Sequence, residues 1–283
     1  MKRKIISFGE IVWDIFESQK TLGGAPLNFA YFCGKFGADA RVLSAVGCDD
    51  LGGQTLDIMR KSRIKTDFVR RLEGVPTGRV LVKIKDASPS YEICSPAAWD
   101  NIAPCPEALK FAASANALYF GTLAQRSEAS RQSLFKIIRA APKKCLKVFD
   151  ANLRQNFYSK DILLRSMEAA DILKLSDEEL PVISKIFSIG GSETECARAI
   201  FSMFNLSCVL LTCGKRGHVV VSSEGEISGK SKAGKIADTV GAGDSFTARF
   251  TCEILSGKSA AEAADLAAET AAQVCSRRGA IEI

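Results

Sequence analysis

Short apolar runs alternate with helix-like segments along most of this sequence, and this order constrains the fold more than any other feature. Four of the runs are nearly continuous, at Leu118–Phe120, Val148–Phe149, Ile172–Leu175 and Cys208–Thr212. Strands with one face in water alternate apolar and polar residues, so continuous runs indicate strands that are buried on both faces. We therefore expect an α/β protein with a mostly parallel sheet covered by helices on both sides.

The segment from about Asp67 to Tyr91 does not follow this order. Residues Gly78–Lys85 and Tyr91–Cys94 alternate apolar and polar side chains, which is typical of a half-exposed sheet. We interpret the segment as an antiparallel flap added to the main sheet. Because no repeat or long linker interrupts the 283 residues, one large domain is expected.

Charge and cysteine usage exclude several classes of function. The chain has 38 Lys and Arg against 32 Asp and Glu, a net charge of +6, but no run of five like charges. A nucleic-acid-binding groove is therefore not expected. Ten cysteines without a Cys-x-x-Cys pair and one histidine argue against a zinc site and for a reduced, cytoplasmic protein. No apolar stretch of about 18 residues is present, so membrane insertion is not expected.

The sharpest motif is Asp238–Phe246, with the sequence DTVGAGDSF. Gly241, Ala242 and Gly243 are small residues before an expected helix, so their backbone N–H groups can face an anion at the positive end of the helix dipole. Asp244 is the ionisable group of that first turn. A phosphoryl group there would meet N–H donors for its charge and a carboxylate for the attacking hydroxyl. Taken alone, such a motif is more often a plain turn with a capping aspartate.

A second glycine motif lies in Leu22–Ala30. Gly23 and Gly24 allow a ligand to approach the backbone closely, and Pro26 suits the first turn of a helix. Asn28 offers both a donor and an acceptor, which suits a ligand rich in hydroxyl groups. This motif, too, is compatible with a simple turn before a helix.

Together the two motifs resemble the signatures of the PfkB carbohydrate kinases, the ribokinase-like family. Gly23–Gly53 is similar to the N-terminal signature and Asp238–Phe250 to the C-terminal one, and the resemblance covers nearly the whole chain. It implies a single kinase domain over residues 1–283. The implied fold is a three-layer α/β sandwich with a mostly parallel central sheet and a small β lid near residues 10–20 and 78–100.

The resemblance also implies a mechanism. Asp244 would act as the catalytic base on a primary hydroxyl of a small free sugar, while Gly241, Ala242 and Gly243 would stabilise the phosphoryl group transferred from ATP. The sugar would be bound by Asp14, Gly23, Gly24, Asn28 and Asp244.

ATP and metal ions are implied in the same way. The nucleotide would contact Ser176, Glu179, Thr212, Gly214, Gly217, Gly241 and Gly243. Glu179 corresponds to the glutamate of the family's Asn-x-x-Glu motif, here with Ser176 in place of Asn, and would organise Mg²⁺ through water. Asp238 and the backbone near Gly279 match the family's monovalent cation site, so K⁺ is a candidate activator.

Several details are similar to the fructokinase branch of the family, namely Gly23–Asn28, Ala98–Asp100, Gly121–Arg126 and Asp150–Arg154. Fructose is therefore the expected substrate and fructose 6-phosphate the expected product. A kinase for ribose, 2-keto-3-deoxygluconate or a nucleoside stays open, as does a non-catalytic sugar or nucleotide sensor with this fold. A homodimer formed through the lid is a further expectation.

Three residues have no settled role in this interpretation. Asp150 and Arg154 could form a structural ion pair or line the site. His218 begins an apolar run, and we expect it to be a strand residue near the mouth of the site rather than a catalytic group.

Overall fold

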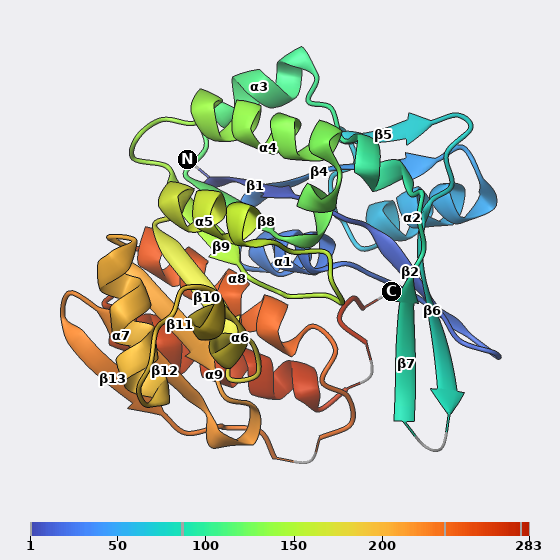
Figure 1. The fold of residues 1–283 in the computed structure, drawn as a ribbon. Coiled ribbons are helices and arrows are strands. Elements are labelled where there is room, and N and C mark those ends of the chain that lie inside the picture. The colour runs from blue at the N-terminus through green and yellow to red at the C-terminus, as the bar shows by residue number, and fades with distance from the viewer. Residues whose placement is uncertain (1, 86–87, 235, 278, 283) are drawn as a thin grey trace.

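A large mixed sheet forms the centre of the protein (Figure 1). The computed structural model describes residues 2–85, 88–234, 236–277 and 279–282. The described residues form a nine-stranded sheet of order β13-β12-β11-β10-β9-β8-β1-β4-β5, which is parallel from β11 to β5 and antiparallel from β11 to β13. Its strands are β1 (Lys4–Phe8), β4 (Asp39–Gly47), β5 (Val69–Leu72), β8 (Ala117–Gly121), β9 (Leu146–Asp150), β10 (Ile172–Ser176), β11 (Cys208–Thr212), β12 (His218–Ser222) and β13 (Gly225–Gly229).

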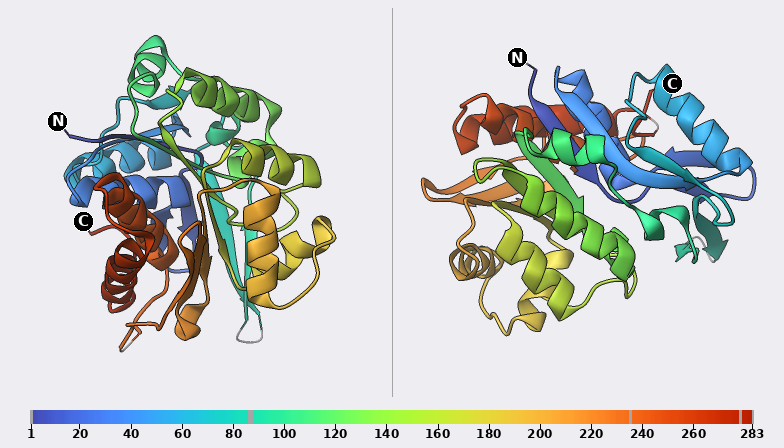
Figure 2. Two further views of the ribbon diagram at one scale, coloured as in Figure 1. Left: turned by 90° about the vertical axis from the view of Figure 1, so that its left-hand side faces the viewer. Right: turned by 90° about the horizontal axis from the view of Figure 1, so that it is seen from above.

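Helices cover both faces of this sheet, as the edge-on view in Figure 2 shows. One face carries α3 (Pro106–Ala112), α4 (Glu128–Ala140), α5 (Lys160–Ala169), α6 (Glu179–Ile186) and α7 (Glu193–Met203). The other carries α1 (Ala25–Lys35), α2 (Asp50–Lys61), α8 (Ala242–Leu255) and α9 (Ala260–Cys275). Three short 3₁₀ helices lie in connecting segments of the described chain: η1 (Ala98–Asn101), η2 (Leu123–Arg126) and η3 (Gly214–Arg216). The expected three-layer sandwich is confirmed.

Neighbouring residues on the central strands explain the two layers. On β1, Ile5 packs into the core under α1 and α8, whereas Ile6 packs into the core under α3 to α7. Successive side chains of a strand point to opposite faces, so an uninterrupted apolar run supplies both cores at once.

A smaller sheet lies beside the carboxyl ends of the central strands. It consists of β2 (Val12–Ile15), β3 (Lys20–Gly23), β6 (Gly78–Lys85) and β7 (Ser88–Ile93), in the order β3-β2-β6-β7. β2 runs parallel to β6, while the other two pairs are antiparallel. The expectation of a purely antiparallel flap was therefore wrong.

The boundary of the flap also differs from the expectation. β5 pairs in parallel with β4, with Val69 opposite Ser44, and forms the edge of the main sheet. Val69 is buried while Arg70 and Arg71 are exposed, because an edge strand has one side open to water. These two polar residues made an edge strand of the main sheet look like part of the flap.

One cation joins the small sheet to the rest of the molecule. The guanidinium of Arg126 stacks 4.0 Å from the centroid of the buried Trp99 ring and donates to both carboxylate oxygens of Asp100 at 2.8 and 2.9 Å. It also donates to the carbonyl of Cys94, just after β7, at 3.0 Å. A Cβ on Gly78, at the start of β6, would overlap the Trp99 indole. The near end of the small sheet is therefore firmly attached.

Candidate active site

The candidate site lies where the parallel strands end. Asp150 is the last residue of β9 and Ser176 the last of β10, while Glu10 follows β1 closely. In open α/β sheets this edge is where ligands bind, because loops and helix N-termini meet there. The small sheet lies beside the same edge (Figure 1).

Asp244 lies in the first turn of α8, after a glycine turn. Gly241 precedes the helix with φ 78° and ψ 0°, a left-handed conformation that glycine adopts at no steric cost. Asn28 on α1 donates from Nδ2 to Oδ2 of Asp244 at 2.8 Å, and α1 packs against α8. The two glycine motifs, more than 200 positions apart in the sequence, thus meet in one hydrogen bond.

Burial dominates the electrostatics of Asp244. It raises the pKa of the carboxyl above its ordinary value of 3.8, although the Asn28 hydrogen bond and the charges of Lys174 and Arg154 act in the opposite direction. A carboxylate with a raised pKa binds a proton more readily, which suits a general base.

The residues predicted for the sugar are connected to Asp244 through Asn28. Asn28 is 3% exposed, and its Oδ1 has no hydrogen-bond partner among the described residues. Asp14 on β2 is half-buried, and its Oδ2 lies 3.5 Å from where a Cβ on Gly23 would be. A Cβ on Gly24 would lie 2.5 Å from the carbonyl oxygen of Glu10, so this position admits only glycine. The structure brings the predicted set together.

Glu10 is a site residue that sequence reasoning missed. Its side chain is 4% exposed, and burial raises its pKa to about 7, with Arg154 opposing and Asp244 and Asp150 adding to the rise. An acidic residue that directly follows the first buried strand and its glycine was the available signal.

Asp150 pairs with a lysine, and not with Arg154. Its Oδ1 lies 3.1 Å from Nζ of Lys174 on β10, and its Oδ2 accepts from the Tyr119 hydroxyl at 3.0 Å. Burial raises the pKa of Asp150 to about 6 even though Lys174 lowers it. Arg154 is exposed and forms no ion pair within the described part of the chain. The alternative of an Asp150–Arg154 pair was therefore wrong.

A cavity of about 400 Å³ lies on the other side of the glycine turn. Of the residues predicted to bind the nucleotide, it is lined by Ser176, Thr212, Gly214, Gly217 and Gly243. Its apolar wall comes from α8 and α9 and was not predicted, although the alanine-rich face of α9 was a signal for it; this wall comprises Phe246, Ala268, Ala271 and Ala272. Such a slot fits a flat aromatic base.

His218 lies in the same cavity, as the first residue of β12. It is buried, its ring centroid is 5.3 Å from that of Phe246, and burial lowers its pKa. The expectation of a strand residue at the mouth of the site agrees with this position.

Glu179 and Gly241 lie beside this cavity rather than in its wall. The carboxylate of Glu179 accepts from the backbone N–H of Leu153 and of Ser176, both at 2.7 Å, and so joins the loop after β9 to the end of β10. Within the described residues, no group of three or more His, Cys, Asp and Glu side chains could hold a metal ion. Any divalent ion here would depend mainly on phosphate oxygens and water.

The residues proposed for a monovalent cation are also neighbours. Asp238 accepts from the N–H of Gly279 at 3.0 Å and from the N–H of Val240 at 3.0 Å. These contacts tie the last described residues to the segment before the glycine turn.

Comparison with known proteins identifies the family. The pfkB family of carbohydrate kinases matches residues 2–283. The chain belongs to this family. A putative sugar kinase of Pyrococcus horikoshii is 27% identical over 268 residues, covering 89% of this chain and 82% of the relative. A fructokinase of Klebsiella pneumoniae is 28% identical over 261 residues, covering 88% and 83%.

Solved structures agree with the pfkB assignment. The Pyrococcus horikoshii sugar kinase in complex with ATP has a TM-score of 0.84 at 26% identity, covering 98% of this chain and 93% of that one. A fructokinase of Xylella fastidiosa with bound ATP has a TM-score of 0.87, covering 99% and 94%, but at 18% identity it supports the fold alone.

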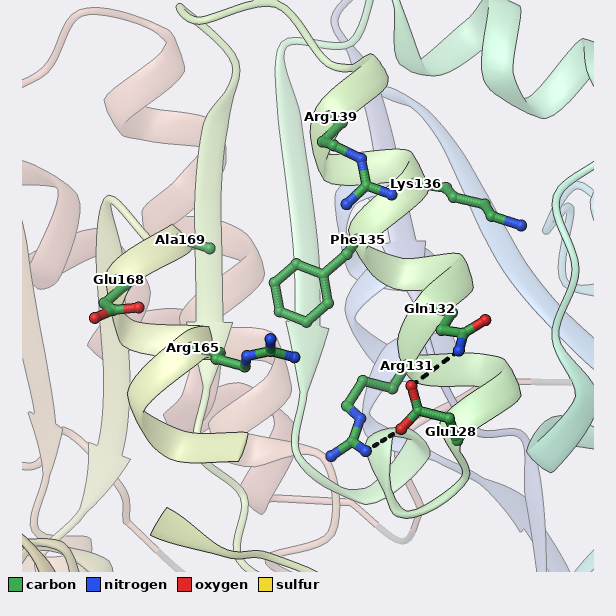
Figure 3. Close-up of a pocket in the computed structure, with 9 residues that line it drawn as sticks. All are labelled: Glu128, Arg131, Gln132, Phe135, Lys136, Arg139, Arg165, Glu168 and Ala169. Atoms are coloured by element: carbon green, nitrogen blue, oxygen red, sulfur yellow. Dashed lines mark hydrogen bonds and ion pairs between the residues drawn. The ribbon is translucent and has the colours of Figure 1, made fainter. Parts of the chain in front are cut away.

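A second cavity of this pfkB kinase, of about 540 Å³, lies between α4 and α5, away from the glycine turn (Figure 3). Within it, Glu128 pairs with Arg131 and accepts a hydrogen bond from Gln132. It contains none of the predicted site residues. No helix in the described ranges combines the length and apolar character needed to cross a bilayer.

Proposed function

We propose that this pfkB kinase transfers the γ-phosphoryl group of ATP to a primary hydroxyl of a small free sugar. The observation that supports the proposal most directly is the hydrogen bond from Asn28 to Asp244, together with the apolar cavity that the neighbouring Gly243 lines. A relative that is 26% identical was solved with ATP, which supports the choice of nucleotide.

ATP is proposed to lie in the cavity beside α9, with its base against Phe246 and the alanine wall. Its γ-phosphate would then point at Gly241–Gly243, where N–H groups at the start of α8 stabilise negative charge. The sugar would lie between Asp14, Gly24 and Asn28. The small sheet would close over it as a lid and exclude water, which otherwise competes as the acceptor.

Asp244 would orient the attacking hydroxyl and receive its proton. In a loose phosphoryl-transfer transition state the proton leaves late, so orientation matters at least as much as basicity. The hydrogen bond from Asn28 fixes one carboxylate oxygen, which leaves the other for the sugar.

Two ions are part of the proposal. Glu179 is held by two backbone N–H groups, so its carboxylate is fixed where water bound to a Mg²⁺–ATP complex could reach it. Mg²⁺ would neutralise charge on the phosphates. Asp238, with the backbone of Gly279, is the proposed K⁺ site. A homodimer formed through the small sheet is proposed as well.

Fructose is the sugar we propose, with fructose 6-phosphate as the product. Ala25 and Pro26 border the sugar side with few hydrogen-bond donors, and relatives with the name fructokinase cover most of the chain at up to 28% identity. Ribose, 2-keto-3-deoxygluconate and nucleosides are the competing acceptors.

The test is ADP release with Mg²⁺–ATP across fructose, ribose, glucose, tagatose, 2-keto-3-deoxygluconate and adenosine. Fructose is expected to have the highest kcat/KM, and ³¹P NMR should place the phosphate on a primary carbon. Deoxyfructoses should be rejected more strongly than ribose, because a polar site rejects a missing hydroxyl best. A higher kcat/KM for ribose or adenosine would refute fructose but not the kinase. The absence of ADP release with any sugar would refute the kinase.

A further inference from the structure

Lys174 is an unusual residue for its position. It lies in the middle of β10, among Ile172, Leu173 and Leu175, and only 9% of its side chain is exposed. A buried ammonium is costly unless it is paired and hydrogen-bonded. The contacts of this ammonium therefore indicate what it does.

Its partner satisfies it only in part. Nζ lies 3.1 Å from Oδ1 of Asp150, so this oxygen engages one N–H group of the ammonium. The other oxygen of Asp150 is taken by Tyr119. An ammonium has three N–H donors, so Lys174 keeps donors for something else.

The open side of the ammonium faces the glycine turn. A Cβ on Gly243 would lie 3.4 Å from Nζ and 3.8 Å from Cε of Lys174. Gly243 is in the first turn of α8, next to Asp244. A cation beside a helix N-terminus is unfavourable, since both are positive. The pair becomes favourable when an anion lies between them.

Nearby carboxylates also keep Lys174 protonated. Burial alone would lower its pKa, but nearby carboxylates, Asp150 first among them, outweigh burial and raise the pKa above its ordinary value of 10.5. The side chain therefore stays an ammonium at neutral pH. It donates hydrogen bonds and gives up no proton.

We propose that Lys174 is a catalytic residue whose buried ammonium, held by Asp150, binds the phosphoryl group of ATP as it is transferred past Gly243. The proposal rests on the kinase function proposed above. The bond from the γ-phosphorus to the bridging oxygen of ADP breaks, and a bond to the sugar oxygen forms. The hydroxyl proton goes to Asp244, while Lys174 offsets charge on the phosphoryl oxygens throughout. Asp150 and Tyr119 are positioning residues for the lysine.

The proposed role and a purely structural role of Lys174 predict different results, because in the proposal the lysine contacts only the γ-phosphate of ATP. Lys174→Met should weaken binding of β,γ-methylene-ATP by about tenfold or more, the worth of a charge-assisted hydrogen bond. ADP binding should change by less than about twofold, since ADP lacks that group. The fall in kcat should be about 100-fold or more, as for the loss of one charge-stabilising donor. Isothermal titration calorimetry and ADP release measure these values.

The chain offers a matched control in Lys147. This lysine lies on β9 and pairs with Asp171 at 2.9 Å, with 16% of its side chain exposed, at the opposite end of the strands. Lys147→Met should leave the preference for β,γ-methylene-ATP over ADP unchanged. Asp150→Asn, which keeps the ammonium, should retain part of that preference. If Lys174→Met does not fold, the double variant Lys174→Met/Asp150→Asn removes both buried charges and should show the same selective loss.

Two results would overturn the role of Lys174. One is a kcat within about threefold of wild type, and the other is an equal loss of affinity for ADP and for β,γ-methylene-ATP. If the proposed kinase function itself is wrong, the experiment gives a different result. A wild-type protein that phosphorylates no sugar would refute the kinase proposal, while the two binding constants would still decide whether Lys174 contacts the γ-phosphate.

Discussion

Replacing Glu10 by glutamine should stabilise this kinase at alkaline pH and have little effect in acid. The side chain is 4% exposed, and burial raises its pKa to about 7 from the ordinary 4.5. Between these values the folded protein holds a proton that the unfolded chain releases. Stability therefore falls as pH rises through this window, and the penalty is complete above pH 7.

The size of the penalty follows from the two pKa values. Each tenfold difference in proton affinity corresponds to about 1.4 kcal/mol, so a pKa of about 7 against 4.5 costs the folded state about 3 kcal/mol once Glu10 is charged. Glutamine has nearly the same shape and carries no charge. Relative to wild type, Glu10→Gln should gain about 1 kcal/mol at pH 5 and about 3 kcal/mol at pH 8.

Urea unfolding followed by circular dichroism at pH 5, 6, 7 and 8 measures this difference. Glu224→Gln, an exposed glutamate in the turn between β12 and β13, is the control and should show no trend with pH. A stability difference between Glu10→Gln and wild type that is the same at pH 5 and pH 8 would show that the carboxyl is not destabilised by burial. The electrostatic account of the site would then be wrong.

Three further predictions concern the glycine turn. Asp244→Asn should lower kcat by about 10²–10⁴-fold with ATP affinity nearly unchanged; near-native turnover would remove Asp244 from the mechanism. Asn28→Ala removes the hydrogen bond that lowers the pKa of Asp244, so the acidic limb of the kcat–pH profile should move to higher pH, and a fixed limb would contradict this. Gly241→Ala should lower Tm more than Gly257→Ala, because both residues have a φ near +80° but a Cβ overlaps Ala280 only at Gly241. The extra loss of folding free energy is about 1–3 kcal/mol, and equal decreases in Tm would refute this prediction.

Much of the fold could be predicted because strands that are buried on both faces have continuous apolar runs in the sequence. The apolar runs at Ile172–Leu175 and Cys208–Thr212 became β10 and β11, and Pro26 lies in the first turn of α1 as expected. β5 was misplaced because its two exposed arginines make it resemble a strand of the flap rather than a buried strand of the main sheet. Only pairing with β4 distinguishes the two, and pairing partners are not encoded locally.

The site was predictable to the extent that it lies in short motifs. The glycines in these motifs indicate turns or close approaches of the backbone, and this could be inferred from the residues of Gly241–Asp244 and Gly23–Asn28 alone. The pairing of Asp150 with Lys174 could not, because it depends on which strands become neighbours and on their register. Glu10 was missed for a related reason: an acid after a strand is ordinary until the fold buries it.

The attachment made by Arg126 bears on how the small sheet can move. Its stacking on Trp99 and its bonds to Asp100 and to the carbonyl of Cys94 hold the base of β6 and β7 against the central sheet. A rigid swing of the whole small sheet would break the hydrogen bond from Arg126 to the carbonyl of Cys94 and would separate Gly78 from the Trp99 indole. Bending along the strands, beyond the held base, breaks none of them. Access to the proposed sugar site would therefore depend on bending of these two strands rather than on a hinge in a loop.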